Sequence, residues 1–376
     1  MIYLDNSATT KIDSSVLETF NRVNKLYFGN PSSLHELGET TTGLLTQSRR
    51  LIAETMGVQS EEIFFTSGGT EGDNWVVKGT ALEKIHFGKH LITSEIEHPA
   101  VLESIKQLEN LGWEVTYLPV DSRGIISVEN LKRALREDTV LVSVMAVNNE
   151  TGSIQPVEKI GEILKDYPSI HFHVDAVQAV GKIDLKLGEQ SRIDMAVFSG
   201  HKFHGPKSTG FVYVKKGRKL APLLSGGGQE AGRRSGTENV PGIVAMAKAL
   251  KITSEKQIKI QSKLTIELEE YLDKKKNIEI FSPKHRAPHI LCFGIKGIKG
   301  EVLVHAFEKK GVFVSTTSAC SSKKKTESST LLAMGIPKIT AETAIRVSLS
   351  EENTQEELEK FIKIFDEIYH SFKVIL

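Results

Sequence analysis

The sequence predicts an α/β protein whose larger part is a mostly parallel sheet with helices on both faces. Between residues 43 and 250, short apolar runs typical of buried strands alternate with segments of helical periodicity. Because the carboxyl ends of parallel strands meet at one edge of a sheet, polar residues that follow these strands are expected to form one site. Five such residues lie just after predicted strands: Thr70, His98, Asn149, Asp175 and Lys202.

The length of the chain predicts two domains. Its 376 residues exceed what one compact core usually holds. A long helical segment at 241–272 is followed by new strand patterns, so this segment is expected to join the domains. We expect a large domain over 14–255 and a smaller α/β domain made of 1–13 and 256–376.

The composition excludes several classes of protein. A hydrophobic content of 39% and a charged content of 25% are ordinary for a soluble enzyme, and a formal net charge of +1 gives no basic field for nucleic acid. No apolar run approaches the roughly 18 residues of a membrane helix, and the N-terminus has no signal-peptide pattern. Two cysteines, Cys292 and Cys320, are too few for a disulfide framework or a zinc site. We therefore expect a cytoplasmic protein without a membrane, nucleic-acid or resident metal site.

The expected elements alternate along the chain. Apolar runs bounded by turn residues predict strands, and Pro99 suits the first position of the helix that follows one of them. The predicted helices cover 14–26, 44–56, 100–110, 128–136 and 156–165, and a further helix opens at the glycine turn 66–72 and runs through 75–77. The predicted strands cover 63–65, 90–95, 113–120, 140–147, 170–174, 195–198, 210–214, 278–281, 290–293 and 312–315.

Lys202 lies in the polar segment 199–206, between two apolar runs that predict buried strands. Ser199 and His201 precede it, and a Gly-Pro turn follows it. A lysine at the mouth of a strand reaches a carbonyl with its long arm, and burial makes its amine nucleophilic. The alternative from these residues alone is an exposed lysine in a polar turn.

Asp175 ends a strand-like run 27 positions before Lys202. This pair suits pyridoxal phosphate, since the ring nitrogen must stay protonated for the ring to act as an electron sink. The motifs His-Val-Asp-Ala-x-Gln, at 173–178, and Phe-Ser-Gly-His-Lys-x-x-Gly-Pro, at 198–206, complete the pattern. The chain resembles the NifS/IscS-like cysteine desulfurases of the class-V, fold-type I pyridoxal-phosphate enzymes. The resemblance runs from Tyr3 to about Ser350.

The resemblance implies cofactor contacts. A strand, a glycine turn and a helix start at 63–72 make an anion site, although tight turns use glycine in any case. The family match implies that Gly69 and Thr70 bind the phosphate, and that His98 stacks on the ring and helps to move protons. Three further positions match contacts to the phosphate and the ring hydroxyl: Gln178, Ser199 and His201.

The resemblance also implies substrate and subunit contacts. Asn149 would lie beside the cofactor and the substrate carboxylate, and Arg346 would clamp that carboxylate with its planar fork. Taken alone, two Asn before a turn are ordinary turn chemistry, and one Arg in a strand is more often an ion-pair partner. Thr237, in the family's Arg-x-Gly-Thr pattern, would enter the phosphate site of a second copy, so a homodimer is implied.

Cys320 lies in a stretch, 315–329, that lacks periodic apolar positions and predicts a loop of about a dozen residues. Small hydroxylated neighbours leave its thiol reachable, and Lys323, Lys324 and Lys325 favour the thiolate. Its Thr-Ser-Ala-Cys-Ser sequence, at 317–321, resembles the Ser-x-Ala-Cys-Ser pattern of the desulfurases whose catalytic cysteine is on a long loop. An idle exposed thiol is the alternative. Cys292, in an apolar run, is expected to be a buried packing residue.

The resemblance implies a reaction. L-cysteine would lose its sulfur to Cys320, giving L-alanine and a persulfide that passes to an acceptor protein of iron–sulfur cluster assembly or tRNA thiolation. Lys202 would be the base at the substrate α-carbon, and Cys320 would contact iron–sulfur only transiently. Two rivals stay open: another class-V activity, such as an aminotransferase or selenocysteine lyase, and a non-catalytic sulfur-relay subunit.

Two features depart from the family pattern. Asp73 puts a negative charge directly after the phosphate turn, where it would either face solvent or weaken phosphate binding. The three lysines 323–325 would form a docking patch for an acidic acceptor or a local tRNA-facing patch.

Overall fold

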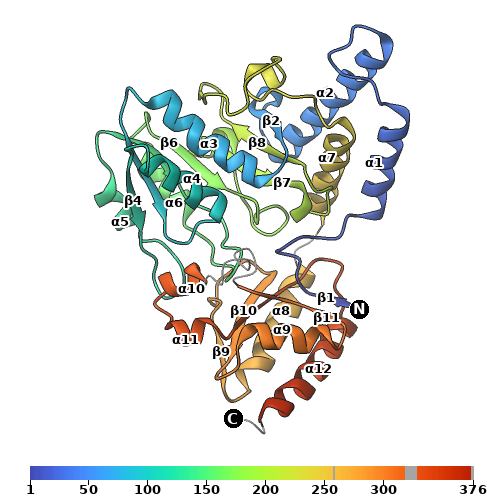
Figure 1. Cartoon of the computed structure of the whole chain (residues 1–376), viewed down its shortest axis with the longest axis vertical. Coiled ribbons are helices and arrows are strands. Elements are labelled where there is room, and N and C mark those ends of the chain that lie inside the picture. Colours follow the sequence, from blue (N-terminus) through green and yellow to red (C-terminus); the bar gives the residue numbers. More distant parts are fainter. Residues whose placement is uncertain (257–258, 318–327, 374–376) are drawn as a thin grey trace.

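The computed structural model describes residues 1–256, 259–317 and 328–373. Its largest sheet has seven strands in the order β2-β8-β7-β6-β5-β3-β4 and occupies the upper part of Figure 1. Five neighbouring strands from β7 to β4 are parallel, whereas β8 is antiparallel to both β2 and β7. The strands are β2 (Ile63–Thr66), β3 (His90–Ser94), β4 (Glu114–Leu118), β5 (Thr139–Ser143), β6 (His171–Asp175), β7 (Met195–Ser199) and β8 (Gly210–Val214). The predicted mostly parallel α/β architecture is confirmed.

Helices cover both faces of this sheet because its strands are apolar on both sides. On one face, Val77 and Val101 of α3 and α4 pack on Leu141 of β5. On the other, residues of α2, α6 and α7 pack on Phe172 and Val174 of β6. The helices around this sheet are α1 (Ser14–Leu26), α2 (Glu36–Met56), α3 (Gly69–Lys84), α4 (Pro99–Glu109), α5 (Val128–Ala134), α6 (Val157–Leu164) and α7 (Val240–Glu255).

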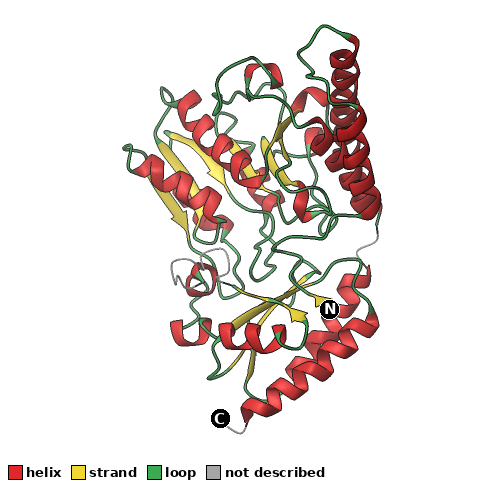
Figure 2. Cartoon of the chain, turned by 45° about the vertical axis from the view of Figure 1, so that its right-hand side comes forward, coloured by secondary structure: helices red, strands yellow, loops and turns green. Residues whose placement is uncertain are grey.

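A second, antiparallel sheet of four strands lies in the lower part of Figure 1, in the order β12-β13-β10-β9. Its strands are β9 (Ile278–Ile280), β10 (Ile290–Ile295), β12 (Ser315–Thr316) and β13 (Ala344–Ser348), and its helices are α8 (Lys259–Asp273), α9 (Gly300–Glu308), α10 (Ser329–Ala333), α11 (Lys338–Ala341) and α12 (Gln355–Lys373). Figure 2 shows the two long helices α8 and α12 running along one side of this part.

The first residues of the chain pack with the last third of it. Strand β1 (Ile2–Tyr3) pairs in parallel with β11 (Val312–Phe313), and Figure 1 shows the N-terminus beside β11 in the lower part of the molecule. Ile2 and Leu4 belong to the same apolar cluster as Leu291 and Phe361. The chain then passes between the two sheets before α1 begins, and this path brings residues 5–10 to the edge of the large sheet.

Several element predictions differ from the structure, including the following four. Helix α2 begins eight residues early, at Glu36, where His35 caps it by accepting from Gly38 N at 3.3 Å; its first turns hold too few apolar residues to show periodicity. The segment 241–272 is two helices. The run 312–315 contributes to two different strands. Strand β5 ends at Ser143, because the apolar residues after it are buried without pairing in the ladder.

Among the helices that the structure describes, none has the length and apolar character that a membrane crossing requires.

Candidate active site

Lys202 lies where the large sheet meets the N-terminal segment. Strand β7 ends at Ser199, and one short 3-10 turn, Gly200–Lys202, carries the lysine out of the sheet. Its Nζ donates to the carbonyl oxygens of Ser7 at 2.6 Å and Ala8 at 2.9 Å. Two main-chain acceptors thus hold this half-buried ammonium group at the edge where the parallel strands end.

Asp175 is the last residue of β6, the strand next to β7, and only 5% of it is exposed. Its Oδ1 accepts from the main-chain N–H of Val177 at 3.0 Å. Burial is the main cause that raises the pKa of Asp175, to about 7, whereas the N–H of Val177 and the charge of Lys202 act in the opposite direction. A cation that approached this carboxylate would therefore be bound strongly.

The start of α3 has the features of an anion site. Gly68 (φ 147°) precedes the helix, and within the described part of the chain no side chain caps its first turn, so its N–H groups point outward. The Oγ atom of Ser199 lies close to this turn, 3.5 Å from where a Cβ on Gly68 would be. A Cβ on Gly69 would come within 2.8 Å of Val177 Cγ2, so glycine is required for this close approach. Thr70 is exposed at the same turn.

The N-terminal segment also holds Gln178 and His201. Gln178 Nε2 donates to Ser7 O at 2.9 Å, the same oxygen that Lys202 contacts. His201 Nδ1 lies 3.1 Å from Thr9 Oγ1. Burial and the nearby Lys202 charge lower the pKa of His201 to about 4, so its ring is neutral at pH 7.

His98 caps α4 from the end of the β3 loop. Its Nδ1 accepts from Ala100 N at 3.1 Å, which leaves the ring proton of the neutral form on Nε2. Burial and the Lys202 charge lower the pKa of His98 to about 4. The side chain therefore offers a neutral ring with one free N–H.

Arg346, on β13, reaches the same region from the second sheet and is 2% exposed. Its Nη1 donates to Asn149 O, and its Nη2 pairs with Asp5 Oδ1, both at 2.9 Å. The Nε atom is buried and has no hydrogen-bond partner among the described residues. Asn149 was predicted to follow β5 directly, but it lies six residues after the end of that strand. It is on a turn that Asn148 stabilises, since Asn148 Oδ1 accepts from Glu150 N and Thr151 N.

The remaining predicted positions lie apart from this group or outside the described residues. Thr237 is exposed, on a loop that Arg234 ties to α3 through a forked pair with Glu71 at 2.7 and 3.0 Å. Cys320 and the lysines 323–325 fall outside the described ranges. Cys292 is fully buried and burial raises its pKa, consistent with a packing role.

Asp73 does not face solvent, so the first of the two alternatives is wrong, and the second, a weaker phosphate site, stays a prediction. It is 1% exposed, on the side of α3 that packs on the sheet, with its Oδ1 3.4 Å from His173 Nε2 on β6. The helical period could have predicted the burial of Asp73. The buried residues Val76, Val77 and Thr80 lie three, four and seven positions after Asp73, on the same face of the helix.

Sequence reasoning missed two residues that hold the site. Asp5 follows no strand that the sequence predicts, and its importance is seen only in the structure, from its ion pair with Arg346. The Nε2 atom of His289 lies 3.3 Å from Gln178 Oε1, and this contact orients the Gln178 amide. The helical and strand patterns give no signal for either contact.

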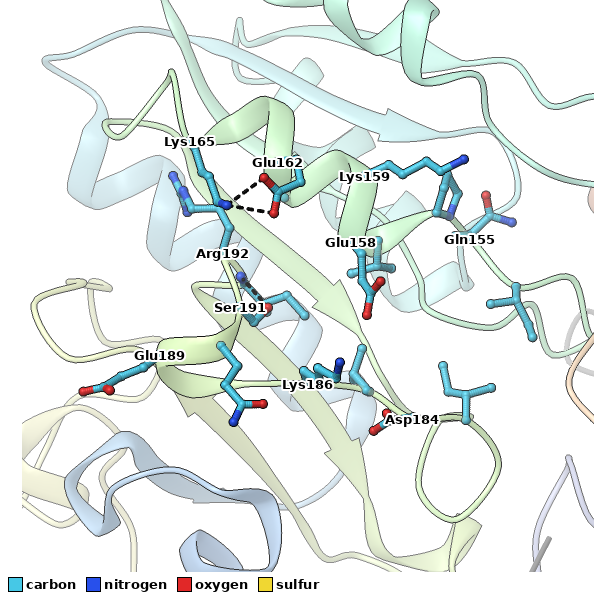
Figure 3. Close-up of a pocket in the computed structure, with 18 of the residues that line it drawn as sticks. Gln155, Glu158, Lys159, Glu162, Lys165, Asp184, Lys186, Glu189, Ser191 and Arg192 are labelled. Atoms are coloured by element: carbon cyan, nitrogen blue, oxygen red, sulfur yellow. Dashed lines mark hydrogen bonds and ion pairs between the residues drawn. The ribbon is translucent and has the colours of Figure 1, made fainter.

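A large surface cavity lies elsewhere. It has a volume of about 840 Å³ between α6 and residues 183–193, and none of the predicted site residues lines it. Figure 3 shows acidic and basic side chains interspersed on its walls, with Lys165 paired to Glu162 at 2.6 Å. This mixed charge favours no single class of ligand.

Known proteins resemble the chain over its whole length. The profile of the family described as "Aminotransferase class-V" matches residues 2–361. A Lactobacillus delbrueckii subsp. bulgaricus protein named "NifS/IcsS protein homolog" is 54% identical, covering 100% of this chain and 99% of that protein. A Methanosarcina thermophila protein named "Cysteine desulfurase IscS" is 42% identical, covering 99% and 93%. A solved structure titled "NIFS-LIKE PROTEIN" superposes with a TM-score of 0.93 at 41% identity, covering 98% and 99%. The chain therefore belongs to the class-V aminotransferase family, among its NifS- and IscS-like members.

Proposed function

We propose that the chain is a cysteine desulfurase, which takes sulfur from L-cysteine and leaves L-alanine. The observation that carries the proposal is the convergence of Lys202 and Arg346 on residues 5–8, at the edge of the large sheet where Asp175 ends the strand next to that of Lys202. The relatives named as cysteine desulfurases support the same activity. Arg346 provides a guanidinium group that can bind a substrate carboxylate, which a site for the cofactor alone would not need.

The residues present fit pyridoxal 5′-phosphate, the cofactor of this family. The uncapped α3 turn suits the phosphate, and Gly69, Thr70, Ser199 and His201 would bind it, joined by Thr237 of a second copy. The buried Asp175 suits the protonated ring nitrogen, as its raised pKa shows how poorly the carboxylate is otherwise compensated. His98 would stack on the ring, and Gln178 would face the ring hydroxyl.

The chain's own residues supply positioning and proton transfer. The bound cofactor supplies an electron sink that acidifies the substrate α-carbon and weakens its Cβ–S bond. Arg346 would bind the substrate carboxylate through Nε and Nη2, beside Asn149, and so hold the α-carbon near Lys202. Lys202 would be the general base there, and His98, neutral with its proton on Nε2, would hand protons on.

Cys320, which lies outside the described residues, would be the sulfur acceptor. Its thiolate would attack the substrate sulfur, forming an S–S bond as the Cβ–S bond breaks. The electron pair of the broken bond stays with the carbon skeleton and is protonated, giving L-alanine. The products, one L-alanine and one persulfide on Cys320, balance one L-cysteine and one thiol.

Several further properties belong to the same proposal. The persulfide would pass to an acceptor protein of iron–sulfur cluster assembly or tRNA thiolation. The protein would be cytoplasmic. Its active form would be a homodimer, because Thr237 is exposed on a loop anchored beside the phosphate turn and could reach a second copy. The large domain would span 14–255, and the smaller one would combine 1–13 with 256–376.

The test is the release of alanine and sulfide from L-cysteine by the purified protein, beside Lys202→Ala and Cys320→Ala. We expect Lys202→Ala to lose turnover and the visible absorbance of the lysine-linked cofactor. Cys320→Ala should keep that absorbance and lose turnover. Full desulfuration by Cys320→Ala would exclude the sulfur relay and favour a lyase or aminotransferase. Absence of turnover in the wild type, with any acceptor added, would favour a non-catalytic subunit.

A further inference from the structure

A group of buried ionisable side chains lies behind Asp175. Asp73 of α3, Glu97 after β3, and His173 and Asp175 of β6 are all at most 5% exposed. His173 and Asp175 are two positions apart in one strand, so they share a face, and that face is the one α3 covers. Three carboxyls in so apolar a place cannot all be ionised together.

Two atoms of this group face each other without a conventional hydrogen bond. Asp73 Oδ1 and His173 Nε2 are 3.4 Å apart, and each has no other partner among the described residues. On the far side of the ring, His173 Nδ1 lies 2.8 Å from Ser143 Oγ on β5. A single proton between Asp73 and His173 would satisfy both facing atoms.

The surroundings decide where that proton lies. Asp175 accepts a main-chain N–H and lies within the field of Lys202. Glu97 Oε1 accepts from Ser94 Oγ and Met145 N, although its Oε2 has no partner among the described residues. For Asp73, the described residues supply no group other than His173. Asp73 is therefore the carboxyl least able to be an anion. Burial also raises the pKa of Asp73 well above its usual range and lowers the pKa of His173 to about 4, and both directions favour a proton on the carboxyl and a neutral ring.

We propose that Asp73 and His173 are a positioning pair, in which the protonated Asp73 donates from Oδ1 to His173 Nε2, so that no negative charge competes with Asp175. The ring then donates from Nδ1 to Ser143 Oγ, which fixes the end of β6. Asp175 is left as the carboxylate that faces the cofactor ring nitrogen. This last consequence rests on the proposed function, whereas the position of the proton does not.

The proton is located by ¹⁵N NMR of the loaded, histidine-labelled protein between pH 6 and 8. His173→Gln assigns the signal. We expect a neutral imidazole with its proton on Nδ1. A proton on Nε2, or on both nitrogens, overturns the proposal without reference to activity.

The pair's effect is measured as the affinity of the cofactor-free protein for pyridoxal phosphate from pH 6 to 9. Asp73→Ala leaves Nε2 without a donor and should weaken binding about tenfold. Asp73→Asn supplies a neutral N–H donor and should restore most of that loss, with the pH profile of the wild type, because Glu97, Asp175, His173 and Lys202 would see no change of charge. If Asp73→Asn binds as weakly as Asp73→Ala, or shifts the profile, Asp73 carries a charge and the proposal fails. If Asp73→Ala binds like the wild type, the pair positions nothing.

Asp175→Asn separates this proposal from the proposed function. It should lose most of the affinity whether or not Asp73 is protonated. If Asp175→Asn binds pyridoxal phosphate as tightly as the wild type, the proposed role of Asp175 is refuted. The NMR result for His173 tests the position of the proton independently of that outcome.

Discussion

Asp5 and Arg346 are 341 residues apart in the sequence and form an ion pair of 2.9 Å between Oδ1 and Nη2. Asp5 Oδ2 also accepts from Ser315 Oγ at 2.7 Å, and Arg346 Nη1 donates to Asn149 O. The guanidinium is thus held on two sides, and its buried Nε remains for a ligand.

Replacing Arg346 by Lys should raise the KM for L-cysteine, because an ammonium group cannot reproduce a two-point grip on a carboxylate. Loss of one charge-assisted hydrogen bond corresponds to about 10- to 100-fold in KM. Steady-state alanine formation measures it. Arg50→Lys, at an exposed pair with Glu54, is the control and should keep the wild-type KM. An unchanged KM in Arg346→Lys would remove Arg346 from the substrate site.

Arg49 and Arg50 offer a test of buried against exposed ion pairs. Arg49 grips both oxygens of Glu230, at 2.8 and 2.7 Å, and the Glu230 side chain is 3% exposed. Arg49→Lys loses the fork and should reduce the free energy of unfolding by about 2 kcal/mol. Arg50→Lys should change it by less than about 0.5 kcal/mol. Urea unfolding curves compare the two, and equal losses would contradict the argument.

The lowered pKa of Glu351 predicts that part of the folding stability is lost in acid. Burial alone would raise its pKa, but the hydrogen bond with His204 and the charge of Lys182 outweigh burial and hold the pKa far below 4.5. The folded state therefore binds this proton more weakly than the unfolded state. The stabilisation is complete above the ordinary pKa of 4.5 and is lost as the pH falls below it.

Glu351→Gln should accordingly reduce the free energy of unfolding by about 3 kcal/mol at pH 7. The difference from the wild type should shrink steadily between pH 5 and pH 3. Chemical unfolding at each pH measures it, with the exposed neighbour Glu352→Gln as the control. A difference that grows on acidification would show that the sign is wrong.

Gly69 and Gly43 are both helical glycines with different surroundings. A Cβ on Gly69 meets Val177 Cγ2 at 2.8 Å, whereas a Cβ on Gly43 meets nothing within 4 Å. Gly69→Ala should push the α3 turn away from Ser199 and weaken pyridoxal phosphate binding about tenfold, as for a lost hydrogen bond. Gly43→Ala should leave binding unchanged and stabilise α2 by about 0.5–1 kcal/mol. Equal affinities of the two variants would exclude a close-packed phosphate turn.

Local patterns predicted the large sheet and much of the site for a physical reason. Strands buried on both faces are continuous apolar runs, and the polar residues after them must gather at one edge. Lys202 and Asp175 follow neighbouring strands, so their proximity could be inferred from order alone.

The rest depends on contacts between distant segments. The pair of Asp5 with Arg346 joins the start of the chain to its last strand, and no local period encodes it. The end of β5 could not be read from composition, because Val144 and Val147 are as buried as the strand itself. The burial of Asp73 was not predicted, because the expectation followed from its charge and not from its place on the same helical face as Val76 and Val77.

The pairing of β1 with β11 has a consequence for synthesis on the ribosome. Residues 2–3 are made long before their partners at 312–313, so the strands of the large sheet are all available before β1 can pair. The segment between β1 and α1, which contacts Lys202 and Arg346, therefore cannot take its final place until β11 and β13 have been made, since a domain can fold while later residues are still being synthesised. A nascent chain can thus contain a folded large sheet before its site is complete, and sulfur chemistry would have to wait for the strands of the second sheet.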